Sequence, residues 1–262
     1  MIKKIKLISI GVIMFFALIF SWYLIDRFSY SEELPFYSTT FNNDTTLTIG
    51  IIGDSWVAGK KVDSLLQAGL ESKGFQNEVI SSGQPGAKSK LIYQNLFKDT
   101  CDEYSSRFLI EASPDFCIVI AGVNDAVGQL GSDFYAHHIV LIIKTLLHYN
   151  ITPVIVNLPE FGVVETIDGK GFLKRERNKL FSRFTNGGEI DNIRTYRSAL
   201  DKKLEIEKLN DKIIKVDFDN VCVDYTQHKN LYANPSHLNK LGNIEFSKAI
   251  VNELIREIPL RY

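Results

Sequence analysis

The chain of 262 residues is 45% hydrophobic and 23% charged, which is typical of a packed globular protein rather than a disordered one. Its length suits one α/β domain of roughly 200–230 residues plus an appendage. The formal net charge of −1 argues against a nucleic-acid-binding protein, which normally presents a strongly basic face. Three scattered cysteines, Cys101, Cys117 and Cys222, predict neither a disulfide framework nor a zinc site, and we expect no metal or cofactor.

The N-terminal region contains an apolar segment. Residues 7–25 carry no charge and are about as long as the apolar core of a bilayer requires. Lysines precede the segment and acidic residues follow it, so the positive-inside rule predicts a cytosolic tail at 1–6 and an extracytoplasmic domain. We therefore expect an uncleaved single-pass membrane anchor, with a cleaved signal peptide as the alternative. Residues 26–45, which include Pro35 and polar clusters, are predicted to form a stalk.

Strands and helices alternate after the stalk. Helical periodicity is expected over about 62–70, 88–97, 133–149 and 191–209 and in a final helix near 246–254, whereas residues 160–190, with Gly169, Gly171, Gly187 and Gly188, are expected to be irregular. Short apolar runs predict five strands: Thr46–Ile52, Glu78–Ser81, Phe116–Ala121, Pro153–Asn157 and Lys212–Asp217. This alternation predicts a three-layer α/β/α sandwich with a mostly parallel five-stranded sheet, spanning residues 46–262.

The first strand ends in Gly53-Asp54-Ser55-Trp56, where a parallel sheet presents polar side chains. A phosphate-binding loop ending at Gly59-Lys60 would need glycine at position 54 and serine or threonine at position 61, which are Asp54 and Lys61. The nucleophile elbow of lipase-type α/β-hydrolases would need glycine in place of Val57. Both familiar motifs are therefore absent, and Ser55 remains a candidate nucleophile.

Four blocks together resemble the SGNH (GDSL-type) hydrolase family, over about residues 46–256. They are Gly53-Asp54-Ser55-Trp56, Ser82-Gly83-Gln84-Pro85-Gly86, Gly122-Val123-Asn124-Asp125 and His237-Leu238-Asn239. The resemblance implies a flavodoxin-like fold, Ser55 as nucleophile and His237 as general base. It also implies an oxyanion hole formed by the backbone N–H groups of Ser55 and Gly86 and by the Asn124 amide.

The residue chemistry is compatible with these roles. A serine hydroxyl becomes a good nucleophile when a base removes its proton, and histidine has a suitable pKa for that task. Each of these residues also has a non-catalytic interpretation: Ser55 as a helix N-cap, Asn124 as a turn residue and His237 as a surface histidine. We interpret the other histidines, His137, His138, His148 and His228, as structural or solvated.

One position departs from the family pattern, whose last block usually has aspartate three residues before the histidine. Here that residue is Asn234. An amide oxygen can orient the imidazole, but it cannot stabilise the imidazolium by charge. Three hypotheses remain: Asn234 or a backbone carbonyl orients His237, another carboxylate (Asp217, Asp219 or Asp224) reaches it, or the catalyst is weakened.

The segment from Lys170 to Arg183 combines six basic residues with phenylalanine and leucine. It is either a rim that contacts an anionic glycan or lipid headgroups, or a solvated insertion. For the whole protein we expect a membrane-anchored extracytoplasmic serine esterase that removes small acyl groups, acetyl first among them, from a carbohydrate. The alternatives are an O-acyltransferase acting on envelope or exported polysaccharide at the same site and a non-catalytic glycan- or partner-binding module.

Overall fold

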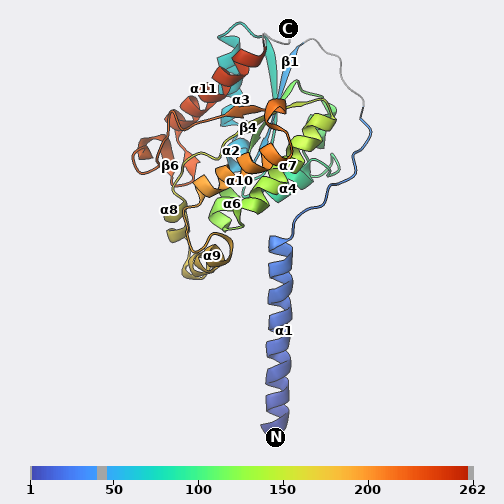
Figure 1. Ribbon diagram of the computed structural model, residues 1–262, viewed down its shortest axis with the longest axis vertical. Helices are drawn as coiled ribbons and strands as arrows, with labels where there is room; N and C mark the ends of the chain where they lie inside the picture. Colours follow the sequence, from blue (N-terminus) through green and yellow to red (C-terminus); the bar gives the residue numbers. More distant parts are fainter. Residues whose placement is uncertain (1, 40–45, 259–262) are drawn as a thin grey trace. The chain divides into compact units, whose positions relative to one another are not determined.

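The computed structural model describes residues 2–39 and 46–258, with side chains of the first helix described from Val12 onward. It separates into two compact units, one ending at Ser31 and one starting at Glu32. The first unit is the helix α1 (Ile2–Phe28) (Figure 1). Most of its described apolar side chains, such as Phe15, Leu18 and Trp22, are exposed.

The structure does not support the predicted membrane anchor at 7–25. Within the described residues, no helix combines the length and the apolarity that a membrane span requires. Residues 7–11 of the predicted anchor, and the tail at 1–6, lie outside the described side chains.

The second unit contains the expected five-stranded sheet, and every pairing in it is parallel. The strand order is β2-β1-β3-β4-β5. This is the flavodoxin-like order, whose topological switch point lies between β1 and β3. The carboxyl end of β1, where Ser55 follows, therefore faces the crevice in which such sheets bind ligands. The strands are β1 (Leu47–Gly53), β2 (Asn77–Gly83), β3 (Phe116–Ile120), β4 (Thr152–Val156) and β5 (Ile214–Val216).

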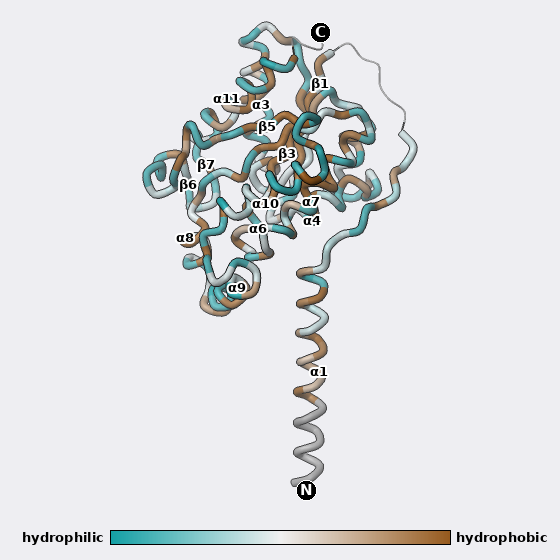
Figure 2. Tube along the Cα trace, in the orientation of Figure 1, coloured by the Kyte–Doolittle hydropathy of each residue, from teal (hydrophilic) through white to brown (hydrophobic). Residues whose placement is uncertain are grey.

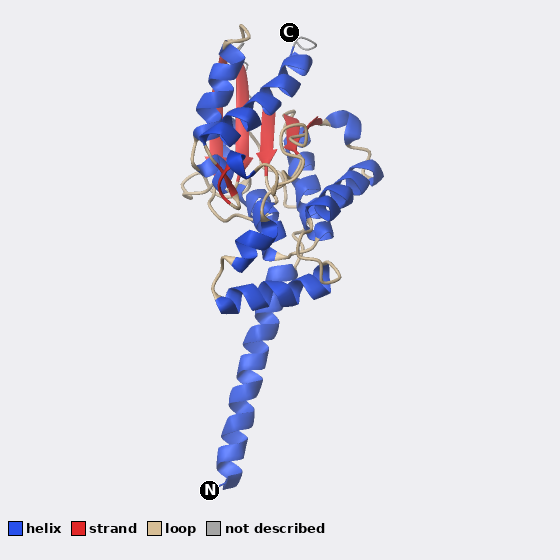
Figure 3. Cartoon of the chain, turned by 90° about the vertical axis from the view of Figure 1, so that its left-hand side faces the viewer, coloured by secondary structure: helices blue, strands red, loops and turns tan. Residues whose placement is uncertain are grey.

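Helices cover both faces of the sheet, as the sandwich prediction requires (Figures 1 and 3). α3 packs with α11, and α7 packs with α4 and α10. The central strands are apolar and buried along their whole length, and Figure 2 shows hydrophobic residues at the centre of this unit. The helices are α2 (Ser55–Ala58), α3 (Lys61–Glu71), α4 (Ser89–Asn95), α5 (Arg107–Glu111), α6 (Val123–Gly128), α7 (Ser132–His148), α8 (Val163–Asp168), α9 (Phe172–Thr185), α10 (Ile193–Ile206), α11 (Lys240–Glu257) and the 3₁₀ turns η1 (Asn210–Lys212) and η2 (Lys229–Leu231).

The expectation of irregular structure over 160–190 is wrong, because this segment forms α8 and α9. The glycines that suggested a loop lie at the helix boundaries. Gly169 ends α8, Gly171 precedes α9, and Gly187 and Gly188 follow α9 with φ of 63° and 93°. Glycine at a helix end permits a left-handed residue without interrupting the helix itself.

Part of the predicted stalk packs against the second unit. The Tyr37 backbone N–H donates to the Tyr149 hydroxyl (2.9 Å), and the Leu34 N–H donates to the Tyr93 hydroxyl (2.8 Å). The Phe36 ring stacks on His148 with centroids 3.7 Å apart. The segment 32–39, which we call the strap, is therefore attached to α4 and α7, and residues 40–45 lie outside the described residues.

Candidate active site

Two glycines allow α2 to lie against the end of β1. A Cβ on Gly53 would lie 2.3 Å from the Ile120 carbonyl oxygen of β3, and a Cβ on Gly83 would lie 2.3 Å from the Ala58 nitrogen. Asp54 then caps α2 by accepting the Trp56 N–H (3.0 Å). Ser55 is the first residue of α2, so its N–H is one of the amides that have no acceptor within the helix.

The Ser55 hydroxyl lies in hydrogen-bond contact with the histidine that the sequence selected. Ser55 Oγ is 3.1 Å from His237 Nε2. His237 Nδ1 is 2.9 Å from Asn234 Oδ1. Because an amide oxygen only accepts, Nδ1 carries the hydrogen, and Nε2 is left to accept the Ser55 proton. The three side chains form a continuous chain with the polarity that a nucleophile, base and orienter require.

A short antiparallel hairpin, which we call the base hairpin, positions both His237 and Asn234. Its strands are β6 (Tyr232–Asn234) and β7 (His237–Leu238), and Asn234 pairs with His237 across the turn. Trp56 attaches this hairpin to α2, since its indole N–H donates to the Ser236 carbonyl oxygen (2.8 Å). The buried indole also packs edge-on against Phe246 of α11. The sequence alone gave no sign that Trp56 connects α2 to the base hairpin.

The electrostatic environment keeps His237 neutral. Burial lowers the pKa of His237, and the positive charge of Lys61 lowers it further. The three carboxylates proposed as alternative partners make other contacts. Asp217 accepts the Asp219 N–H, Asp219 pairs with Arg197 (2.7 Å), and Asp224 accepts from Thr226.

Asn124, the expected side-chain oxyanion donor, connects two of the blocks. Its amide donates one hydrogen to Asp54 Oδ2 (3.1 Å) and the other to the Ala87 carbonyl oxygen (3.0 Å). Both amide hydrogens therefore have acceptors within the protein. For Asn124 to donate to an oxyanion, one of these hydrogen bonds must be released or shared.

The loop that carries Gly86 is fixed by the residue after Asn124. The buried Asp125 accepts both the backbone N–H (2.9 Å) and the hydroxyl (2.6 Å) of Ser89. Gly86 has φ of 75° and is exposed, and a Cβ there would meet nothing within 4 Å. Its conformation, rather than crowding, accounts for the glycine. The expected donors thus lie at the start of α2 (Ser55), in the first turn of α6 (Asn124) and on the loop before α4 (Gly86), and hydrogen bonds connect these segments.

Asp54 is a buried acid directly beside these donors. The pKa of Asp54 is raised to about 7, mainly by burial and also by the nearby Asp125, although the Trp56 N–H and the Asn124 amide act in the opposite direction. Asp125 is also fully buried, and burial raises its pKa. The Ser89 hydrogen bonds and the Lys88 charge oppose that shift. Each acid therefore holds an element of the expected oxyanion hole through hydrogen bonds, Asp54 to Trp56 and Asn124 and Asp125 to Ser89.

Many solved structures share this architecture. A GDSL-like lipase from Bacteroides thetaiotaomicron is 13% identical, with a TM-score of 0.57 over 80% of this chain and 89% of the other. An acetyl xylan esterase, AlAXEase, is 18% identical, with a TM-score of 0.54 over 80% and 99%. The psychrotrophic esterase EstA from Pseudoalteromonas sp. is 13% identical, with a TM-score of 0.56 over 81% and 99%. The domain has the fold of the SGNH (GDSL-type) ester hydrolases. No family model matches the sequence, and no curated protein sequence matches it significantly.

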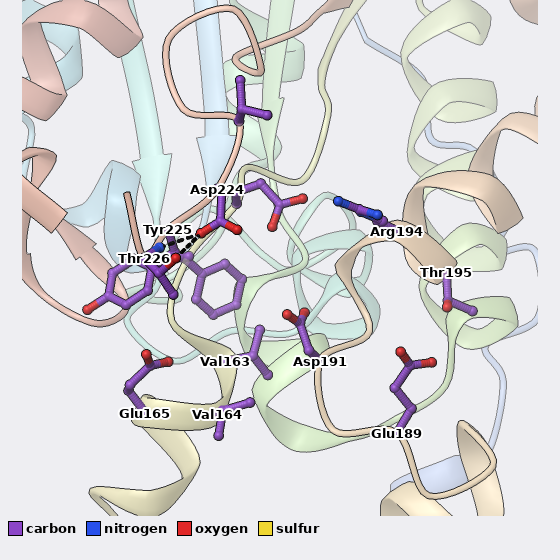
Figure 4. Close-up of a pocket in the computed structure, with 13 residues that line it drawn as sticks. Val163, Val164, Glu165, Glu189, Asp191, Arg194, Thr195, Asp224, Tyr225 and Thr226 are labelled. Atoms are coloured by element: carbon purple, nitrogen blue, oxygen red, sulfur yellow. Dashed lines mark hydrogen bonds between the residues drawn. The ribbon is translucent and has the colours of Figure 1, made fainter. Parts of the chain in front are cut away.

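Two cavities of this domain bear on the site. The smaller, of about 70 Å³, adjoins Ser55 and His237 and is bordered by Gly59, Lys61 and Asn243. The larger, of about 330 Å³, lies near the ends of β4 and β5 (Figure 4). Gly162, between two residues that line the larger cavity, donates its N–H to the Pro235 carbonyl oxygen of the base hairpin (2.8 Å).

Two of the other histidines make structural contacts. His138 Nδ1 bonds the Phe134 carbonyl oxygen (2.7 Å), and burial lowers the pKa of His138 to about 4. His228 Nδ1 lies 2.9 Å from the Asp224 carbonyl oxygen. Across the described ranges, no group of three or more His, Cys, Asp or Glu residues is arranged to hold a metal ion.

Proposed function

We propose that this protein is a serine ester hydrolase that releases small acyl groups, acetyl first among them, from a carbohydrate. The observation that carries the proposal is the chain of contacts from Ser55 Oγ through His237 to Asn234 Oδ1. It joins a strand-end serine to a neutral imidazole whose accepting nitrogen faces the hydroxyl. The ester-hydrolase fold of the domain supports the same reading.

In the proposed mechanism, His237 Nε2 takes the Ser55 hydroxyl proton as Oγ attacks the ester carbonyl carbon. The tetrahedral intermediate collapses when the protonated His237 gives its proton to the leaving sugar oxygen, which leaves an acyl group on Ser55. A water molecule, deprotonated by His237, then attacks the acyl-enzyme, and the carboxylic acid leaves as the protonated His237 returns its proton to Ser55 Oγ. Atoms and protons balance over the two half-reactions, and no cofactor takes part.

The oxyanion would accept hydrogen bonds from the N–H groups of Ser55 and Gly86 and from the Asn124 amide. Losing one such donor typically lowers kcat by about 10²–10³. Because both Asn124 hydrogens have acceptors at rest, we propose that an Asn124 hydrogen turns to the oxyanion only as charge develops there. That arrangement favours the transition state over the ground state.

The cavity sizes support the acyl and carbohydrate parts of the proposal. The space of about 70 Å³ that Ser55 and His237 line can hold a group of a few heavy atoms. The larger cavity offers the Tyr225 ring with carboxylates of Glu165, Asp191 and Asp224 around it (Figure 4). Aromatic faces and carboxylates are suited to the C–H faces and hydroxyls of a sugar.

The test is hydrolysis of p-nitrophenyl acetate by the wild-type protein beside Ser55→Ala and His237→Ala. We expect both variants to lose activity by at least 10³-fold, and a fluorophosphonate to add to Ser55 in the wild type. The matched control is Ser72→Ala, which removes an exposed hydroxyl whose hydrogen bond goes to the Gly69 carbonyl oxygen of α3 and which should retain most activity. Wild-type activity no higher than that of Ser55→Ala would overturn the proposal.

The natural reaction is tested next with an acetylated oligosaccharide, with and without an acceptor sugar. Release of acetate in both samples supports the hydrolase. Transfer of acetyl to the acceptor without free acetate would indicate an O-acyltransferase at the same site. Glycan binding without either product would indicate a binding module.

The extracytoplasmic location remains a proposal from the sequence, based on the lysines before and the acidic residues after the N-terminal apolar segment. Cys101 is exposed, whereas Cys117 and Cys222 are buried. A membrane-impermeant maleimide applied to intact cells should therefore label the wild type and not Cys101→Ser. Labelling that requires cell lysis would contradict this location.

A further inference from the structure

Helix α9 presents two different faces. One face packs on the domain: Asn178, Phe181 and Ser182 are buried, and the Asn178 amide donates to the Val127 carbonyl oxygen of α6 (2.9 Å). The other carries large apolar side chains in solvent, with exposed fractions of 67% for Phe172, 81% for Leu173, 44% for Leu180 and 79% for Phe184. At 100° per residue these four lie within an arc of about 120°. We call them the α9 stripe.

The α9 stripe is not explained by folding. Phe172, Leu173 and Phe184 are the three most exposed large apolar side chains among the described residues of the second unit. The buried face of α9 already attaches the helix to the domain. Several large apolar side chains exposed on one side of such a helix indicate an interaction site.

Basic residues surround the α9 stripe. α9 contains Lys174, Arg175, Arg177, Lys179 and Arg183 against a single acid, Glu176. The whole chain has a net charge of −1, so this positive charge is local. Lys174 and Arg183 are exposed, and Arg183 lies next to Phe184. An apolar arc bordered by cations is the pattern of a helix that lies in the interface of a membrane.

We propose that α9 docks on an anionic lipid surface, with the α9 stripe inserted at the level of the acyl chains and the flanking cations against lipid phosphates. The charge of the helix selects an anionic partner. The stripe selects a lipid over a soluble polyanion, because a glycan or nucleic acid would leave Leu173 and Leu180 in water. The proposal does not depend on the catalytic reaction.

The experiment places an environment-sensitive fluorophore on the full chain. In a Cys101→Ser background, Phe184→Cys is labelled with NBD, and Ile206→Cys on α10, also exposed, is the matched control. Vesicles of 70:30 phosphatidylcholine and phosphatidylglycerol should shift the NBD emission at position 184 to the blue and leave position 206 unchanged. Neutral vesicles, or 1 M NaCl, should abolish most of the shift.

Two sets of variants separate the contributions of charge and apolarity. Lys174→Gln and Arg183→Gln should each weaken partitioning on the order of fivefold. Phe172→Ser with Leu173→Ser should remove the shift without changing the melting temperature, since both side chains are exposed. An unshifted spectrum with anionic vesicles, equal shifts at positions 184 and 206, or a shift with dextran sulfate alone would each overturn the proposal.

Discussion

Asn234 gives His237 a fixed orientation without giving it a charge. Its Oδ1 also accepts the Ser236 N–H (3.1 Å), so the turn holds the amide oxygen facing Nδ1. The lowered pKa of His237 follows from burial and Lys61, with no carboxylate at Nδ1 to oppose them. The base is therefore neutral over a wide pH range, but the imidazolium that forms in the transition state lacks a counter-charge.

Asn234→Asp tests whether the missing counter-charge of the imidazolium limits the rate. A carboxylate at Nδ1 favours the imidazolium and raises the pKa of His237. Activity requires neutral His237 and is lost as pH falls through that pKa, so the acid limb of the kcat/KM profile should move to higher pH by about one unit or more. At pH 8, kcat should rise at least tenfold, compared with the ~10⁴ that the reverse change costs in serine proteases. Asn234→Ala is the control, and a lower kcat in Asn234→Asp would show that the amide has its own role.

Asp54→Asn tests the buried acid beside the oxyanion donors. Asparagine has a single accepting oxygen, so it can accept the Trp56 N–H or the Asn124 hydrogen but not both. When that oxygen keeps the cap on α2, Asn124 should be misplaced and kcat should fall by roughly 10². Unfolded, Asp54 releases its proton near pH 4, whereas the folded protein keeps it until about pH 7. The folded state binds more protons in that window, so the free energy of unfolding falls as pH rises across it.

Urea unfolding at pH 5 and pH 8 measures that slope. The loss of stability between the two values should be smaller in Asp54→Asn than in the wild type. Asp125, whose pKa is also raised, contributes in the same direction and remains in the variant. The exposed Asp201→Asn is the control, and an unchanged slope in Asp54→Asn would count against a protonated Asp54.

At the scale of elements, the base hairpin depends on α2 for its position. Trp56→Phe keeps an aromatic ring against Phe246 but removes the hydrogen bond to Ser236. We expect a stability loss of only about 1 kcal/mol, with a larger effect on kcat of about tenfold. Thermal unfolding and esterase assays of the same variant measure the two effects. A fall in kcat no larger than the loss of stability accounts for would indicate that Trp56 has a purely structural role.

The sequence predicted best those elements whose hydrophobic pattern alone determines their structure. Phe116–Ile120 is a continuous apolar run, and burial on both faces makes it a central strand. The base hairpin has strands of three and two residues, too short for any periodicity to appear. His237 lies 182 positions from Ser55 in the chain, so only the folded chain shows that Asn234, rather than Asp217 or Asp224, contacts His237 Nδ1.

At the scale of the molecule, the strap forms the start of the second unit and is held there by specific side-chain contacts. The Tyr149 hydroxyl accepts the Tyr37 N–H and donates to the Tyr37 carbonyl oxygen (3.1 Å). The Arg107 guanidinium lies over the Tyr37 ring, 4.1 Å from its centroid. Burial raises the pKa of Tyr37, which keeps its hydroxyl protonated.

Tyr149→Phe should release the strap while the domain stays folded. Two hydrogen bonds of about 1 kcal/mol each are lost, so cleavage by a protease within 32–39 should accelerate by roughly tenfold or more. Limited proteolysis followed by mass spectrometry measures this, with esterase activity as the control for the intact site. Unchanged cleavage would mean that Phe36 and Leu34 hold the strap without Tyr149.

Because Asn234 and His237 share one hairpin, His237 can move away from Ser55 while it keeps its contact with Asn234. A shift of the hairpin away from α2 would lengthen the Ser55–His237 distance and leave the Asn234–His237 bond unaltered. The Gly162–Pro235 hydrogen bond connects that hairpin to the wall of the larger cavity. We expect a movement of that wall to change the Ser55–His237 distance, while the Nδ1 proton resonance of His237 persists whether or not Nε2 contacts Ser55.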